Sequence, residues 1–146
     1  MNRSILKTVV FALSCALLGN AVFAQAKKPL VVYFSVPEDV QTKGTEDAVS
    51  GASVVVRGGV KYGNTEFVAK TIQKETGADI FRIETVQDYP KSHNALLNAA
   101  QQEERKGTHP QLKGSIADFS RYDTVILCYP VWWYTLPMPV YSFLDS

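Results

Sequence analysis

Cysteine and histidine are scarce in this sequence, with two of each among 146 residues. Cys15 lies in an apolar segment near the N-terminus that we expect to be removed, which leaves Cys128 as the only cysteine of the mature chain. A single cysteine excludes an intramolecular disulfide. Because His93 and His109 show no spacing typical of metal ligands, we expect neither a structural zinc site nor any other metal.

Apolar runs long enough to span a bilayer are also missing at the N-terminus. Residues 9–18 form an apolar run that is too short for comfortable spanning. It follows Arg3 and Lys7, and residues 22–24 (VFA) offer small side chains where a signal peptidase reads. The pattern predicts a signal peptide over residues 1–24 and Sec-type export to the periplasm or the outside of the cell. An uncleaved anchor is the alternative, and after cleavage we expect no membrane attachment.

The mature chain carries no excess of charge. Without residues 1–24 it has 13 basic and 14 acidic residues, a net charge of −1. This balance gives no reason to expect nucleic acid or an anionic membrane surface as a partner. A mature length of 122 residues is enough for one hydrophobic core, so we expect a single domain over residues 25–146.

Short apolar runs alternate with helix-like segments along this domain. We expect strands at residues 30–34, 79–84 and 124–128, and helices that begin near residues 64, 91 and 139. The last strand (TVILC) is continuously apolar, which is typical of a strand buried on both faces. The alternation predicts an α/β fold with a parallel sheet and right-handed crossovers.

The first helix has recognisable ends. Asn64 and Thr65 are both good N-cap residues, and Gly77 is a good stop signal. The spacing of its less polar residues predicts an inward stripe of Phe67, Val68, Thr71 and Ile72.

A long segment, residues 36–62, separates the first strand from the first helix. The glycine pair at residues 58–59, between two β-forming runs, predicts a hairpin. We interpret the segment as an insertion folded back on itself rather than as a linker between domains. Its flanking residues, Ser35 and Gly63, would then meet at the carboxyl edge of the first strand.

A hydroxyl, a glycine and a helix N-terminus would face one point at this edge, contributed by Ser35, Gly63, Asn64 and Thr65. Backbone amides and the helix dipole at such a place bind phosphate without a cationic side chain. An ordinary helix start after a turn has the same residues, so the Gly-Asn-Thr motif alone does not decide between the two interpretations.

The last predicted strand leads into a loop rich in aromatic residues and proline. Trp132, Trp133 and Tyr134 lie between Pro130 and Pro137, and proline cannot continue the strand. Core packing or an interface patch are the alternatives for these aromatics. Two adjacent tryptophans do not easily point into one core, so a flat heteroaromatic ligand explains the cluster better.

Together these motifs resemble the flavodoxin family, most closely members with a GNT phosphate loop and a YP-x-WW aromatic loop. The resemblance rests on LVVYFS at residues 30–35, GNTEFVAKTI at 63–72 and YDTVILCYPVWWYTLPMPVYSFL at 122–144, with shorter matches between them. It implies a three-layer, doubly wound parallel sheet of strand order 2-1-3-4-5. It also implies flavin mononucleotide (FMN) at the switch between the first and third strands.

The resemblance also implies which residues contact FMN. The phosphate-binding loop would comprise Ser35, Gly63, Asn64 and Thr65. The loop that flanks the isoalloxazine ring would comprise Pro130, Val131, Trp132, Trp133 and Tyr134. No protein residue is assigned a catalytic role, because in such proteins the flavin carries the redox chemistry.

Two features depart from the family pattern. Residues 36–62 intervene where the family loop is short, and only the first three of the usual five strands are present. We therefore expect a domain that is incomplete at its C-terminus, with the strand at residues 124–128 at an unprotected edge.

The implied function is an exported, FMN-binding electron-transfer protein or FMN-dependent NAD(P)H oxidoreductase, with an unidentified redox partner. One alternative is a non-redox module that binds another phosphate-bearing aromatic ligand or a protein partner. Another is a non-functional fragment. We interpret His93 and His109 as solvated side chains rather than as proton donors to a reduced flavin.

Overall fold

The fold is built on a three-stranded parallel sheet. A computed structural model describes residues 27–41 and 53–146, so the predicted signal peptide lies outside the described residues. Strand β1 (Lys28–Tyr33) lies between β4 (Asp79–Arg82) and β5 (Tyr122–Cys128), and both pairings are parallel. The predicted α/β class and the parallel sheet are confirmed for these three strands.

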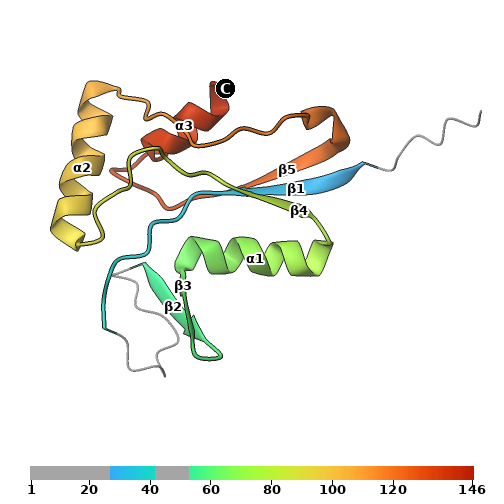
Figure 1. The fold of residues 1–146 in the computed structure, drawn as a ribbon, viewed down its shortest axis with the longest axis horizontal. Coiled ribbons are helices and arrows are strands. Elements are labelled where there is room, and N and C mark those ends of the chain that lie inside the picture. Colours follow the sequence, from blue (N-terminus) through green and yellow to red (C-terminus); the bar gives the residue numbers. More distant parts are fainter. Residues whose placement is uncertain (1–26, 42–52) are drawn as a thin grey trace, which may run out of the picture.

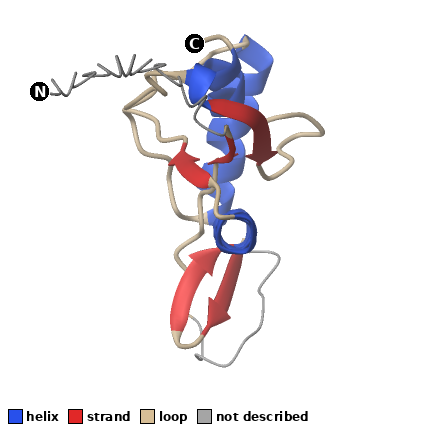
Figure 2. Ribbon diagram, turned by 90° about the vertical axis from the view of Figure 1, so that its right-hand side faces the viewer, coloured by secondary structure: helices blue, strands red, loops and turns tan. Residues whose placement is uncertain are grey.

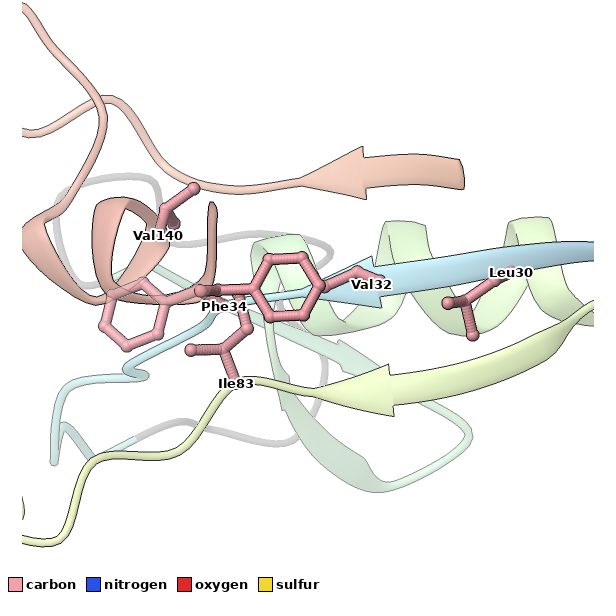
Figure 3. Packing of buried hydrophobic residues seen from close by; sticks show 6 residues of the cluster. Leu30, Val32, Phe34, Ile83 and Val140 are labelled. Atoms are coloured by element: carbon pink, nitrogen blue, oxygen red, sulfur yellow. The ribbon is translucent and has the colours of Figure 1, made fainter. Parts of the chain in front are cut away.

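The central strand β1 supplies both hydrophobic clusters, because successive side chains of a strand point to opposite faces. One cluster joins the β1 segment to Ile83, which follows β4, and to Val140 of the C-terminal helix. Figure 3 shows its side chains Leu30, Val32, Phe34, Ile83 and Val140 gathered together. The other cluster contains Val31, Tyr33, Ala69 and Ala78. The domain is therefore organised around β1, with a packed layer on each side.

Helices cover both faces of the sheet, as a doubly wound fold requires. Figure 1 shows α1 (Asn64–Thr76) on one face and α3 (Met138–Leu144) on the other. Helix α2 (His93–Lys106) lies near the carboxyl ends of the strands and packs against α3. A single 3-10 turn, η2 (Phe119–Arg121), leads into β5. The predicted helix starts near residues 64, 91 and 139 agree with these bounds to within two residues.

The inward face of α1 differs in part from the predicted stripe. Ala69 is fully buried against the sheet, whereas Val68 is 51% exposed and Thr71 is exposed. Phe67 turns toward the hairpin instead, with its ring centroid 5.9 Å from that of Tyr62. The prediction failed because the helix packs on two surfaces, the sheet and the hairpin. The stop at Gly77 is confirmed, with φ 66° and a bond from its N–H to Gln73 O.

The predicted hairpin is present as β2 (Val54–Arg57) and β3 (Val60–Gly63), which pair in antiparallel register. Gly58 and Gly59 connect them at φ 58° and 77°, the left-handed conformations that a tight hairpin turn needs. Figure 2 shows α1 end-on between this hairpin and the three-stranded sheet. The chain thus leaves the sheet after β1 and returns through β3 directly into α1.

Strand β5 lies at one edge of the described sheet. Its side chains are less buried than those of a strand that is covered on both faces. Val125 is 46% exposed, while Ile126, Leu127 and Cys128 are partly buried against the two clusters. The expectation of an edge strand is met for the described residues, and the expectation of full burial is wrong. Among residues 27–41 and 53–146, no helix combines the length and apolarity that a membrane span needs.

Candidate ligand-binding site

The two ends of the insertion meet, as the sequence predicted. Ser35 follows β1 and is 6% exposed, and Gly63 ends β3. A Cβ atom on Gly63 would overlap Ser35 Oγ and would lie 3.5 Å from Pro37 Cδ. Only glycine permits this close approach, which holds the Ser35 hydroxyl against the start of α1.

The start of α1 is arranged differently from the expected cap. Gly63 is the N-cap residue, so Asn64 and Thr65 are the first two helical residues and neither side chain caps the helix. The Asn64 N–H donates to Ser53 O at 2.9 Å, and a Glu66 carboxylate oxygen lies 3.5 Å from the Gly63 nitrogen. Because their side chains do not cap the helix, Asn64 and Thr65 can turn to a ligand at this positive end.

Glu66 places a negative charge at the same end of α1. Its carboxylate pairs with Lys70 at 2.7 Å, and this hydrogen bond raises the pKa of the Lys70 ammonium. The Glu66 carboxylate lies close to the predicted phosphate position and opposes an incoming phosphate, although Lys70 offsets part of its charge.

The aromatic loop is a tight turn. Trp132 and Thr135 exchange backbone hydrogen bonds of 3.1 and 3.0 Å, and between them Trp133 and Tyr134 have φ of 47° and 65°. Two left-handed central residues are typical of the type I′ turn, which favours asparagine and glycine. Bulky aromatic residues at these positions cost roughly 1 kcal/mol each, and such strain is characteristic of functional sites.

The turn directs the two tryptophans to different surroundings. This agrees with the expectation that two adjacent tryptophans do not both point into one core. The Trp132 ring packs edge-on against Phe34 and Tyr89, with centroid distances of 5.2 and 5.3 Å. Trp133 turns to α2, where its Nε1–H donates to Leu97 O at 3.2 Å. Tyr134 is 98% exposed at the apex of the turn.

Tyr89 is held in place behind Trp132 by a second contact. Its hydroxyl donates to the Glu103 carboxylate of α2. Burial raises the pKa of both Tyr89 and Glu103. The pair fixes the ring that supports Trp132 and links the aromatic loop to α2.

A cavity of about 460 Å³ lies between α2 and the aromatic turn. Three of its lining residues are polar side chains, Glu38, Ser53 and His93. The others are Leu96, Leu97, Ala100, Pro130, Val131, Trp132, Trp133 and Tyr134. The structure therefore brings together all five residues predicted to flank a ring.

The predicted phosphate-binding residues do not line this cavity, but they lie at the same edge of the sheet. The Phe34 N–H donates to Cys128 O at 3.0 Å, so the segments that follow β1 and β5 leave the sheet side by side. Ser53, which lines the cavity, accepts the hydrogen bond from the Asn64 amide. Ser53 thus connects the cavity to the α1 N-terminus.

One pair of residues at the cavity was missed by sequence reasoning. His93 Nδ1 lies 2.8 Å from a Glu38 carboxylate oxygen, and the Glu38 side chain is only 7% exposed. His93 is exposed, as the sequence predicted, with 53% of its side chain accessible, but its ring also has a partner in Glu38. Both residues follow strands of the parallel sheet at its carboxyl edge, where ligands bind in such folds, and that position was the available signal. His109 lies elsewhere, paired with Asp145 at 2.7 Å and stacked on Tyr141.

Cys128 and the acidic residues offer no metal chemistry within the part of the chain that the structure describes. No group of three histidine, cysteine, aspartate or glutamate residues gathers there to hold an ion. Burial raises the pKa of the Cys128 thiol, which keeps it protonated and unreactive.

Comparison with known proteins agrees with this geometry. The sequence model of the flavodoxin family matches residues 54–146, more than half of the chain. The chain belongs to the flavodoxin family. No curated protein sequence matches this flavodoxin.

Two solved structures share its fold. A protein from Bacteroides eggerthii, described as a candidate flavoprotein, matches with a TM-score of 0.55 and 20% identity, over 81% of this flavodoxin and 61% of that chain. A Bacteroides uniformis protein described in the same way matches with a TM-score of 0.54 and 19% identity, over 82% and 64%. This flavodoxin therefore spans less than two-thirds of the length of either solved chain.

Family membership implies a flavin cofactor, and the described residues fit one. A flavin phosphate ester joins an anionic group to a flat, largely apolar ring with a polar edge. The Ser35–Gly63 contact at the α1 N-terminus suits the anion, and the cavity beside Trp133 suits the ring.

Proposed function

We propose that this flavodoxin binds FMN and transfers electrons outside the cytoplasm. The observation that supports this most directly is the contact between Ser35 and Gly63 at the sheet edge from which the cavity-lining aromatic loop also leaves. An anion-binding helix start and a ring-sized cavity at one edge match the two chemical halves of FMN.

The phosphate half would be held by Ser35, Gly63, Asn64 and Thr65. The Ser35 and Thr65 hydroxyls are hydrogen-bond donors, and the helix dipole adds favourable potential for an anion. The Asn64 N–H already donates to Ser53 O. No lysine or arginine is required at this position. The ester thus fixes the orientation of the whole ligand.

The ring half would be flanked by Pro130, Val131, Trp132, Trp133 and Tyr134. Proline and the tight turn restrict the loop, and Trp133 is anchored to α2 through Leu97 O. When bound, FMN supplies one- and two-electron redox chemistry. The chain contributes stacking surface, exclusion of water and hydrogen bonds to the polar edge of the ring.

Titration of the purified chain with FMN tests the proposal. We expect the flavin fluorescence to be quenched on binding and the flavin to elute with the protein in gel filtration. A chain that neither quenches nor retains FMN contradicts the proposal. Replacing Trp133 with leucine separates ring binding from partner docking. If the variant loses FMN affinity and keeps its binding to a protein partner, Trp133 belongs to a ring site. The converse result supports a binding module without redox function.

Anaerobic addition of NADPH or NADH to the FMN-loaded chain separates the two redox roles. Bleaching of the flavin absorbance assigns an NAD(P)H oxidoreductase, and an unchanged spectrum assigns an electron carrier that another protein reduces. N-terminal sequencing of the exported protein tests the secretion proposal, for which we expect Gln25 as the first residue.

A further inference from the structure

The cavity beside the aromatic turn has a few polar groups in a largely apolar wall. Most of its wall is apolar, formed by α2 and by the loop of residues 130–134. The polar side chains Glu38, His93 and Ser53 come from the insertion and from the first residue of α2. A ligand that fills the cavity therefore meets a few hydrogen-bonding groups and apolar side chains over most of its surface.

A contact with Glu38 fixes the orientation of the His93 ring. Glu38 is buried, and its carboxylate oxygen lies 2.8 Å from His93 Nδ1. With Nδ1 engaged, Nε2 is the ring nitrogen left for another partner, and the His93 side chain remains 53% exposed. A buried carboxylate that orients an imidazole in this way sets which ring nitrogen faces a ligand.

Building on the proposed function, we propose that His93 binds the polar edge of the flavin ring through Nε2 and that Glu38 is its positioning residue. The ring edge carries carbonyl oxygens and ring nitrogens, which pair with imidazole. The negative charge of Glu38 opposes an anionic group beside His93.

A purely structural role is the competing explanation, because the pair also ties the insertion to α2. The Asp39 N–H donates to Lys91 O at 3.0 Å in the same contact, so the two segments have a further connection. Two substitutions separate the roles. His93→Asn keeps a donor near the position of Nδ1 and hence the bond to Glu38, whereas His93→Gln keeps a polar group near the position of Nε2.

FMN dissociation constants of the full chain and its variants test the assignment. We expect His93→Asn to weaken FMN binding roughly five- to tenfold, the worth of one hydrogen bond, and His93→Gln to weaken it less. The control is His109→Asn, which changes the other paired histidine, outside the cavity, and is expected to leave the affinity unchanged. Equal FMN affinities for wild type and His93→Asn would overturn the assignment.

Nitrogen NMR of the wild-type chain gives a second readout that needs no variant. Saturation with FMN is expected to shift the His93 Nε2 resonance and to leave both His109 resonances in place. An unshifted Nε2 resonance in a chain that binds FMN overturns the role of His93 and leaves the proposed function intact. A chain that binds no FMN overturns both.

A double-mutant cycle tests the positioning role of Glu38. If Glu38 acts through His93, Glu38→Ala weakens FMN binding in the wild-type background and has little effect in the His93→Asn background. Equal losses in both backgrounds contradict the positioning role.

Discussion

Gly63 and Ser35 are in such close contact that a single added methyl group on the glycine would overlap the serine hydroxyl. The two residues flank the insertion, whose last part forms the β2–β3 hairpin. Their contact closes the insertion and returns the chain to the carboxyl edge of β1. The proposed phosphate-binding loop would thereby be assembled from segments far apart in sequence.

Gly63→Ala is expected to destabilise the fold by about 1–3 kcal/mol and to weaken FMN binding, because the methyl group displaces Ser35. Thermal unfolding and FMN titration measure the two effects. Ser35→Ala in the same chain removes the overlapping oxygen, so the double variant should recover stability without recovering affinity. Gly114→Ala is the matched control, since a Cβ there meets no atom within 4 Å. Similar melting temperatures for Gly63→Ala and Gly114→Ala would show that the contact is not constraining.

Glu66→Gln is expected to strengthen FMN binding. The substitution removes a negative charge 3.5 Å from the Gly63 nitrogen, at the end of α1 where the phosphate is proposed to bind. A charge at a helix terminus has an effect of about 0.3–1 kcal/mol, or roughly two- to fivefold in affinity. Glu75→Gln changes a carboxylate at the opposite end of α1 and should leave the affinity unchanged. Weaker FMN binding by Glu66→Gln would instead indicate that Glu66 organises the loop.

Tyr134→Asn separates stability from binding in the aromatic turn. Asparagine tolerates the left-handed conformation at φ 65°, so the variant should gain about 1 kcal/mol and melt about 4 °C higher. FMN affinity should fall because stacking surface is lost. An unchanged affinity would show that Tyr134 does not contact the ring, and an unchanged melting temperature would show that the turn is not strained.

The stability of the chain should depend on pH through Glu103. Burial raises the pKa of this carboxyl above its ordinary value of 4.5, so the folded protein holds the proton more tightly than the unfolded chain. This contribution to stability is complete below pH 4.5 and is lost as the pH rises through the folded pKa. Glu103→Gln, which still accepts the Tyr89 hydrogen bond, should flatten this part of the profile of melting temperature against pH.

Tyr89→Phe removes the hydroxyl that donates to Glu103. That hydrogen bond favours the ionised carboxylate, so its loss raises the Glu103 pKa further. The variant should be less stable by about 1–2 kcal/mol at pH 8 and closer to wild type at pH 4. Urea unfolding at both pH values measures the difference, and an equal loss at both would contradict the coupling.

The sequence predicted the elements that depend on local patterns. Three such elements are confirmed: strand β1, the glycine-linked hairpin and the end of α1 at Gly77. Each of them depends on only a few adjacent residues. The meeting of Ser35 with Gly63 was also predictable, because an insertion must return the chain to the sheet edge.

Features that depend on tertiary packing were less predictable. Val68 is exposed because α1 packs on the hairpin as well as on the sheet, and no local pattern encodes that second surface. Asn64 and Thr65 are helical because the chain arrives through β3 with Gly63 as the cap. The Glu38–His93 pair joins the segment after β1 to the first residue of α2, and no local pattern encodes that contact.

Comparison of FMN with riboflavin on the same purified chain tests the central claim most directly, since the two ligands share the ring and differ by the phosphate. Loss of two charge-assisted hydrogen bonds should weaken binding roughly a hundredfold or more. We therefore predict that FMN binds at least that much more tightly than riboflavin, and that Ser35→Ala narrows the difference. Equal dissociation constants, or no binding of either flavin, would contradict a site in which a phosphate loop and an aromatic cavity act together.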